Sequence, residues 1–154
     1  MSNYYESLNG LLELLKDRIS SAITEFKEVT CSIRTDDKNY AFPRCEIVPE
    51  REEISNEIIG DNHNFCLATI RLIPFVKCYS KESGSQEILK LTGKLYDLVY
   101  KIRKEEKHTL FDDLYVDVIE NFYFIGDNYV LYSASLIIKV ELRIWFIKKE
   151  KEVI

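Results

Sequence analysis

The sequence predicts a single α+β domain, in which one mixed or antiparallel β-sheet has two amphipathic helices packed on one face. Two stretches carry apolar residues at helical spacing, and the segments around them alternate apolar and polar residues as strands do. The length of 154 residues suits one domain, which we expect to span residues 1–154 with a frayed C-terminal tail at about 148–154. The elements follow in the order helix, strands, helix, strands. All their apolar stripes are buried when both helices cover one face of a single sheet.

The first helix is predicted from an apolar stripe that begins at Leu8 and ends at Phe26. A short strand at 29–33 follows, because its apolar residues alternate with polar ones. A second strand is expected at 41–48. Pro43 lacks an N–H group, so this strand should either lie at a sheet edge or begin at that proline.

The segment 50–64 is the most polar part of the chain. It is consistent with a loop, a short helix or a hairpin tip, and its composition alone does not choose among them. Ile54, Ile58 and Ile59 stand out among its charged residues. If the segment is exposed, these three isoleucines are expected to contact another chain.

Strict alternation of apolar and polar residues predicts a strong strand at 65–76. The residues 81–86 are interpreted as a linker, with Ser85 as the N-cap of the next helix. That second helix is predicted at 86–104 from its apolar stripe, and Gly93 weakens it.

Strands are also predicted at 114–118 and, after a break, at 122–125. The last strand alternates over about 17 residues from Val130 and would span on the order of 55 Å. A domain of this size has a radius of gyration of about 15 Å. The strand must therefore bend, contain a bulge or project from the body, and a projecting strand leaves edge groups that another subunit can pair.

Several residues are candidates for a subunit interface because they are apolar or large among charged neighbours. In the last strand, Trp145 has the alternative of packing on the chain terminus. The full set of interface candidates is Ile54, Ile58, Ile59, Ile137, Arg143 and Trp145.

Charge and composition exclude several classes of protein. The formal net charge is −5 and the isoelectric point about 5.2, which argues against a nucleic-acid binder with a basic footprint. The N-terminal residues do not resemble a secretory signal, and no run of about 18 apolar residues predicts a membrane span. We therefore expect a protein that is made in a cytoplasm and has no membrane partner.

The residues that carry chemistry form no recognised motif. Four cysteines, Cys31, Cys45, Cys66 and Cys78, are far apart, and they share strand faces with apolar neighbours, so they are predicted to be buried thiols. His63 and His108 lie in polar stretches, and the acidic pairs at 36–37 and 112–113 are typical of turns. The sequence therefore predicts no catalytic residue, no cofactor and no metal site.

The chain resembles the tail terminator and minor tail proteins of long-tailed phages and related viruses. The resemblance rests on the order of the elements and on the Phe42-Pro43 strand, followed by the acidic segment 50–64, the strand at 65–76, the helix at 86–104 and the closing strands. It implies a non-enzymatic virion protein that forms a homo-oligomeric ring of about six subunits. Such a ring caps the tail tube and joins it to the head–neck connector, and DNA passes its lumen without specific binding.

By the same resemblance, the protein is expected at the tail–neck junction of a virion, after synthesis in the host cytoplasm. A neck, head-completion or other tail-completion protein is an alternative with a similar size and fold. A small cytoplasmic ligand-binding or regulatory domain is a second alternative, and it would have a concave apolar pocket. An enzyme would need His63 or His108 beside a carboxylate or a cysteine.

Overall fold

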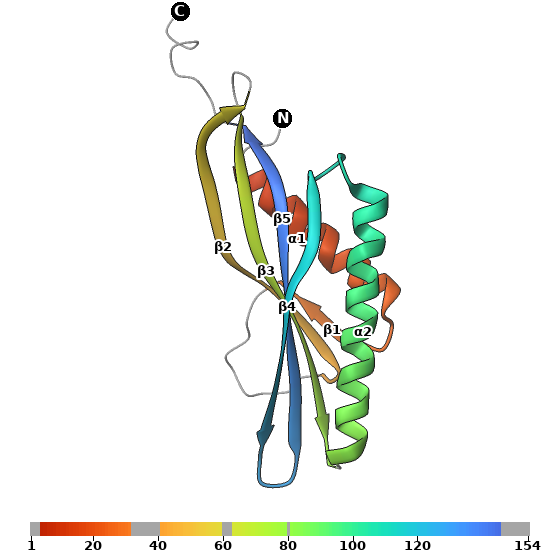
Figure 1. Ribbon diagram of the computed structural model, residues 1–154. Coiled ribbons are helices and arrows are strands. Elements are labelled where there is room, and N and C mark those ends of the chain that lie inside the picture. Colours follow the sequence, from red (N-terminus) through yellow and green to blue (C-terminus); the bar gives the residue numbers. More distant parts are fainter. Residues whose placement is uncertain (1–3, 32–40, 60–62, 80, 146–154) are drawn as a thin grey trace, which may run out of the picture.

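The computed structural model describes residues 4–31, 41–59, 63–79 and 81–145. Its two helices lie on the same side of a single sheet, which confirms the predicted α+β fold (Figure 1). The elements in chain order are α1 (Tyr4–Ala22), β1 (Glu28–Thr30), β2 (Arg44–Ile59), β3 (His63–Cys78), α2 (Lys81–Glu106), β4 (Asp113–Ile125) and β5 (Val130–Trp145).

The strand order in the sheet is β1-β2-β3-β5-β4. β1 pairs with β2 in parallel, and the other neighbours are antiparallel. β3 and β5 form the centre, while β4 is an edge strand and the three-residue β1 borders only the beginning of β2. One edge of the sheet is therefore a long strand that pairs on one side only, within the part of the chain described.

The core lies between the sheet and the helices. Even-numbered residues of β5, from Ala134 to Ile144, are buried together with Ile70 and Leu72 of β3. The stripes of both helices complete this core, for example through Leu15 of α1. The alternation in the sequence thus correctly identified the buried face of the central strands.

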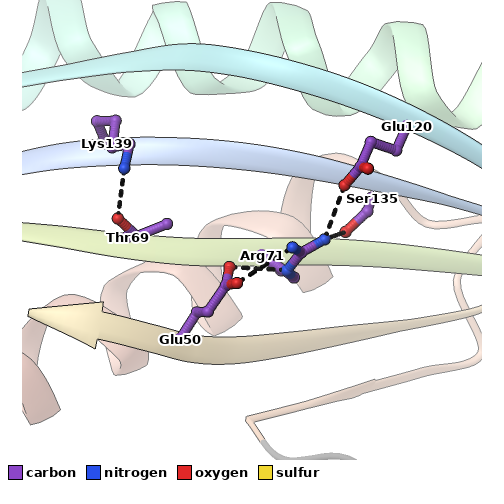
Figure 2. Close-up of polar contacts among 6 residues, drawn as sticks. All are labelled: Glu50, Thr69, Arg71, Glu120, Ser135 and Lys139. Atoms are coloured by element: carbon purple, nitrogen blue, oxygen red, sulfur yellow. Dashed lines mark hydrogen bonds and ion pairs between the residues drawn. The ribbon is translucent and has the colours of Figure 1, made fainter.

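On the opposite face of the sheet, here called the open face, neither described helix is packed (Figure 1). Odd-numbered residues of the central strands lie there, including Arg71 of β3 and Lys139 of β5. Polar side chains on this face are close enough to bond across strands, as Figure 2 shows for six of them.

The second helix begins earlier than the sequence predicts. α2 starts at Lys81, so the predicted linker at 81–86 is helical and Ser85 is not an N-cap. The extra turn packs on the sheet, because Gly84 is buried and the ring of Tyr132 in β5 occupies the space where a Cβ would stand. This contact with β5 favours helix in a segment whose local sequence resembles a linker.

The acidic segment is mainly extended. β2 continues to Ile59 and β3 begins at His63, so the hairpin interpretation of 50–64 is right and the short helix is wrong. The first strand is also shorter than predicted, at Glu28–Thr30, and β2 begins directly after Pro43. Residues 60–62, the predicted polar turn at 34–39 and the tail at 148–154 lie outside the described residues.

β4 is one strand, not the two segments separated by a break that the sequence suggested. A shift in its pairing with β5 between Val116 and Val118 keeps the strand continuous. Such a bulge changes which face the following residues occupy. The long β5 follows the curvature of the sheet, and its hairpin with β4 projects at the end opposite the C-terminal end of β2 (Figure 1).

Candidate functional site

The most unusual surface of the molecule is the end of the β4–β5 hairpin, residues 117–135, here called the distal hairpin. All nine residues from 117 to 125 are exposed, although they form a regular strand with β5. The turn is closed by a hydrogen bond of 2.8 Å from the Gly126 amide to the Tyr129 carbonyl. The β4 arm of the distal hairpin is thus a formed strand that the rest of the described fold does not cover, whereas Ser133 to Ser135 of its β5 arm are buried.

Apolar side chains occupy both faces of β4 in this hairpin. After the bulge, Val118, Phe122 and Phe124 pair with odd-numbered residues of β5 and therefore lie on the open face. The other face, toward the helices, carries Ile119, Tyr123 and Ile125. All six of these residues are exposed, which is uncommon for large apolar side chains grouped on one strand.

Each face of the distal hairpin borders a hollow. On the open face, a hollow of about 360 Å³ is lined mostly by apolar groups, including Phe75, Phe122 and Leu131, and Arg71 lies at its margin. On the helix face, a second hollow of about 420 Å³ separates the hairpin from the first turns of α2, where Leu89 is exposed. The hollows show that neither α2 nor the side chains of the open face pack closely around these aromatic residues.

Arg71 joins several strands at the base of the distal hairpin (Figure 2). Its guanidinium donates two hydrogen bonds to the carboxylate of Glu50 in β2, at 2.7 and 3.1 Å. It also donates to Glu120 of β4 and to the hydroxyl of Ser135 in β5, each at 3.0 Å. A contact of 2.7 Å from Lys139 to Thr69 lies nearby on the same face.

The electrostatics of this cluster favour a structural role for Arg71. The hydrogen bond from Arg71 lowers the pKa of Glu50, and Glu50 and Glu120 raise the pKa of Arg71. Four donated hydrogen bonds use nearly all of the guanidinium's five N–H groups. The cluster therefore holds Glu120 of β4 against the sheet and offers little capacity for an external anion.

The residues predicted to form an interface do not come together. Ile54 is 54% exposed and lies on the helix face of β2, while Arg143 is on the open face of β5, paired with Asp112 at 2.9 Å. Ile137 is half-buried opposite Val118, at the base of the distal hairpin. Ile58, Ile59 and Trp145 are strand residues whose side chains lie outside the described part of the structure.

The exposed residues of β4 are the ones that sequence reasoning missed. The run from Phe122 to Ile125 was assigned to a strand but not to an interface. The sequence does indicate that this run is covered in some way. Its four consecutive apolar residues do not alternate with polar ones, and such a run predicts a strand covered on both faces. Only the strand order shows that this strand lies at an edge, where the fold itself covers neither face.

The groups with potential for chemistry are dispersed. Cys45 and Cys66 are buried as predicted, whereas Cys31 and Cys78, also predicted to be buried, are only half-buried. Burial raises the pKa of the Cys66 thiol to about 11 and that of Cys45 further. His108 occupies the turn after α2, and the side chain of His63 lies outside the described part. Among the described residues, no three His, Cys, Asp or Glu side chains are grouped as metal ligands would be.

Comparison with known proteins gives no relative for this chain, since no family model and no curated sequence matches it. Among the described residues, neither helix is long and apolar enough to cross a membrane.

Proposed function

We propose that this chain is a structural subunit that assembles with copies of itself, and that the distal hairpin is a contact surface of the assembly. The observation that carries the proposal is the strand from 117 to 125, which is exposed throughout and apolar on both faces. Grouped exposed apolar side chains mark interaction surfaces, because water contact with them is unfavourable. A preformed hairpin also loses little conformational entropy on binding.

In its more specific form, the proposal is a tail terminator: a ring of about six subunits that caps a tail tube and contacts the head–neck connector. The resemblance in element order supports this form, and so does the α+β fold. Six copies would carry a net charge of 6 × −5 = −30. Acidic groups along the lumen would let DNA pass without gripping it, because phosphate binding needs lysine and arginine.

The test of the ring is the mass of the purified protein across a concentration series, with negative-stain imaging of the large species. A ring of about six subunits with a central hole is the expected result. A monomer at every concentration, in the presence of a tail tube protein as well as alone, would contradict the proposal. A ring that binds a connector but no tube would favour the neck or head-completion alternative.

A small-molecule binding domain is the second candidate, and the hollow on the open face is the observation that favours it. Apolar groups line most of this hollow, and the hydroxyls of Ser133 and Ser135 supply polar groups at its wall. This function predicts a monomer whose melting temperature rises with a small apolar ligand. Substitution of Phe75 by a larger side chain, Phe75→Trp, would then abolish that rise.

A further inference from the structure

We infer that two copies of the chain pair their β4 strands edge to edge, antiparallel, about a two-fold axis at Asn121. The inference rests on the proposed self-assembly and names the surface that carries it. The sheets of the two copies would then continue into one another through the exposed run 117–125.

The backbone of β4 supplies the first argument. Its N–H and C=O groups pair with β5 on one side, and no described strand pairs with the other side. In an antiparallel strand, alternate residues direct their backbone groups to each side, so the outer edge between 117 and 125 presents a row of free donors and acceptors. An edge of this length, without proline or lysine, is a template for another strand.

The other edge of the sheet, along β2, is protected against the addition of a strand. This leaves β4 of a second copy as the partner for the β4 edge. β1 covers only residues 44–46 of β2, so the rest of β2 is also an edge. That edge contains Pro49, a pairing shift between Pro49 and Arg51, and a second shift between Ile54 and Ile58. Charged side chains and irregularities of this kind prevent strand addition. Within the described residues, the only edge that complements the open β4 edge is the same strand of a second copy.

The sequence of the run fits this symmetry. Pairing about Asn121 places Asp117 opposite Ile125, Val118 opposite Phe124 and Ile119 opposite Tyr123, with Glu120 opposite Phe122. No two like charges face each other. In two of these pairs, Val118 with Phe124 and Ile119 with Tyr123, an aromatic residue meets a β-branched one, which stabilises cross-strand pairs. The two Asn121 side chains meet at the axis, where amide groups can donate to and accept from each other.

The run offers a large apolar surface for a contact. About half of each of its six apolar side chains is exposed, on the order of 600 Å² per copy. A standard interface buries about 800 Å² per partner, so a contact that covers most of this surface, together with the backbone edge, approaches that size.

A two-fold contact is compatible with the proposed ring, because a closed assembly can combine two-fold axes with the axis of a ring. The mass separates the two claims. Two subunits indicate the hairpin pair alone, and six or twelve indicate a ring, each as a multiple of the 18.2 kDa subunit. In a ring, the substitution below shows whether the pair is present: a mass that Asn121→Lys does not lower supports the ring and contradicts the pair.

The decisive variant is Asn121→Lys, with Asn128→Lys as its matched control. Both asparagines are exposed in the same hairpin, and both changes add one positive charge, but Asn128 lies beyond the paired run. Asn121→Lys places two ammonium groups against each other at the axis, and we expect it to raise the dissociation constant at least about tenfold and to halve the mass. Asn128→Lys should keep the wild-type mass.

A cross-linking experiment tests the register. In the full chain, Asn121→Cys treated with a short bis-maleimide should give a covalent dimer, because the two thiols meet at the axis. Asn128→Cys should give none, since its two copies would lie at opposite ends of the paired run. An Asn121→Lys protein that keeps the wild-type mass, or equal cross-linking of the two cysteine variants, would overturn the inference. Circular dichroism of each variant confirms that it is folded.

Discussion

Arg71 of β3 connects its own strand to three others. Its guanidinium reaches carboxylates of β2 and β4 and a hydroxyl of β5 (Figure 2). The contact with Glu120 lies directly before the exposed aromatic residues of β4. Arg71 therefore fixes the point from which the distal hairpin projects.

Replacement of this arginine should loosen the sheet measurably. We expect Arg71→Met to lower the free energy of unfolding by about 1 kcal/mol, because a bidentate pair and a second ion pair are lost while their carboxylates remain partly solvated. Arg51→Met is the control, since Arg51 is largely exposed and pairs with Glu53 at the surface. Its effect should stay within about 0.5 kcal/mol in denaturant titrations.

The same pair predicts a pH dependence. The Arg71 hydrogen bond lowers the pKa of Glu50 below its ordinary value of 4.5 in the folded protein. The stabilisation is therefore complete above that ordinary value and is lost as the pH falls through the lower, folded-state value. The difference in unfolding free energy between wild type and Arg71→Met should shrink as the pH is lowered from about 7 to below 4.5. A difference that stays constant with pH would contradict this role of Glu50.

His108 is the one described residue outside glycine with a positive φ, at 72°, in the turn that follows α2. This left-handed conformation is costly for a residue with a Cβ. We expect His108→Gly to raise the free energy of unfolding by about 0.5–1 kcal/mol, as measured by thermal or denaturant unfolding. A loss of stability would show instead that the imidazole makes a contact the turn depends on.

The burial of a single residue was predictable from the sequence where the apolar pattern of its own strand determines it. Cys45 and Cys66 were predicted to be buried because their strand neighbours are apolar, and they are. The partners of Arg71 were not predictable, because Glu50 and Glu120 are 21 and 49 residues away in the chain. Such contacts depend on strand order and register, which local patterns do not contain.

At the scale of the elements, α2 offers a pair of glycines that should respond in opposite ways. A Cβ at Gly84 would stand 2.4 Å from the ring of Tyr132 and 3.0 Å from the Cβ of Cys78, whereas one at Gly93 would meet nothing within 4 Å. Gly84→Ala should therefore lower the free energy of unfolding by about 1–3 kcal/mol through overpacking. Gly93→Ala should raise it by about 0.5–1 kcal/mol through helix propensity.

Thermal unfolding of the two variants measures both effects under the same conditions. The sign is the informative quantity, because intrinsic propensity alone predicts that both substitutions stabilise the helix. A stabilised Gly84→Ala protein would mean that the first turn of α2 does not pack against Tyr132. In that case the shorter helix predicted from the sequence, beginning at 86, would be the better description.

The elements were predicted best where their own periodicity is strong. The alternation in β3 and β5 gave the correct type and nearly correct bounds, and the stripes of both helices gave the correct type. The first stripe extends to Phe26, although α1 ends at Ala22. The start of α2 and the continuity of β4 were missed, since both depend on contacts with β5. The sequence did not decide the structure of the acidic part of β2. Charged residues at a sheet edge have the composition of a loop when no partner strand is known.

At the scale of the whole molecule, the sheet has two unequal edges. Along the β2 edge, the pairing with β3 is irregular and many side chains are charged. The β4 edge is long and carries apolar side chains on both faces. The sequence predicted a projecting strand that another subunit could pair, but it assigned the interface mainly to the β2 segment and to β5. Once the strand order is known, the distal hairpin becomes the stronger candidate, and the same physical argument about edges applies to it.

The central claim is that the outer edge of β4 is paired in the assembled protein, and amide hydrogen exchange at increasing protein concentration tests it most directly. We expect peptides covering 117–125 to become protected as the concentration rises, while peptides covering 50–55 of β2 exchange at an unchanged rate. Exchange of 117–125 that stays fast at every concentration, although the protein has assembled, would contradict the claim.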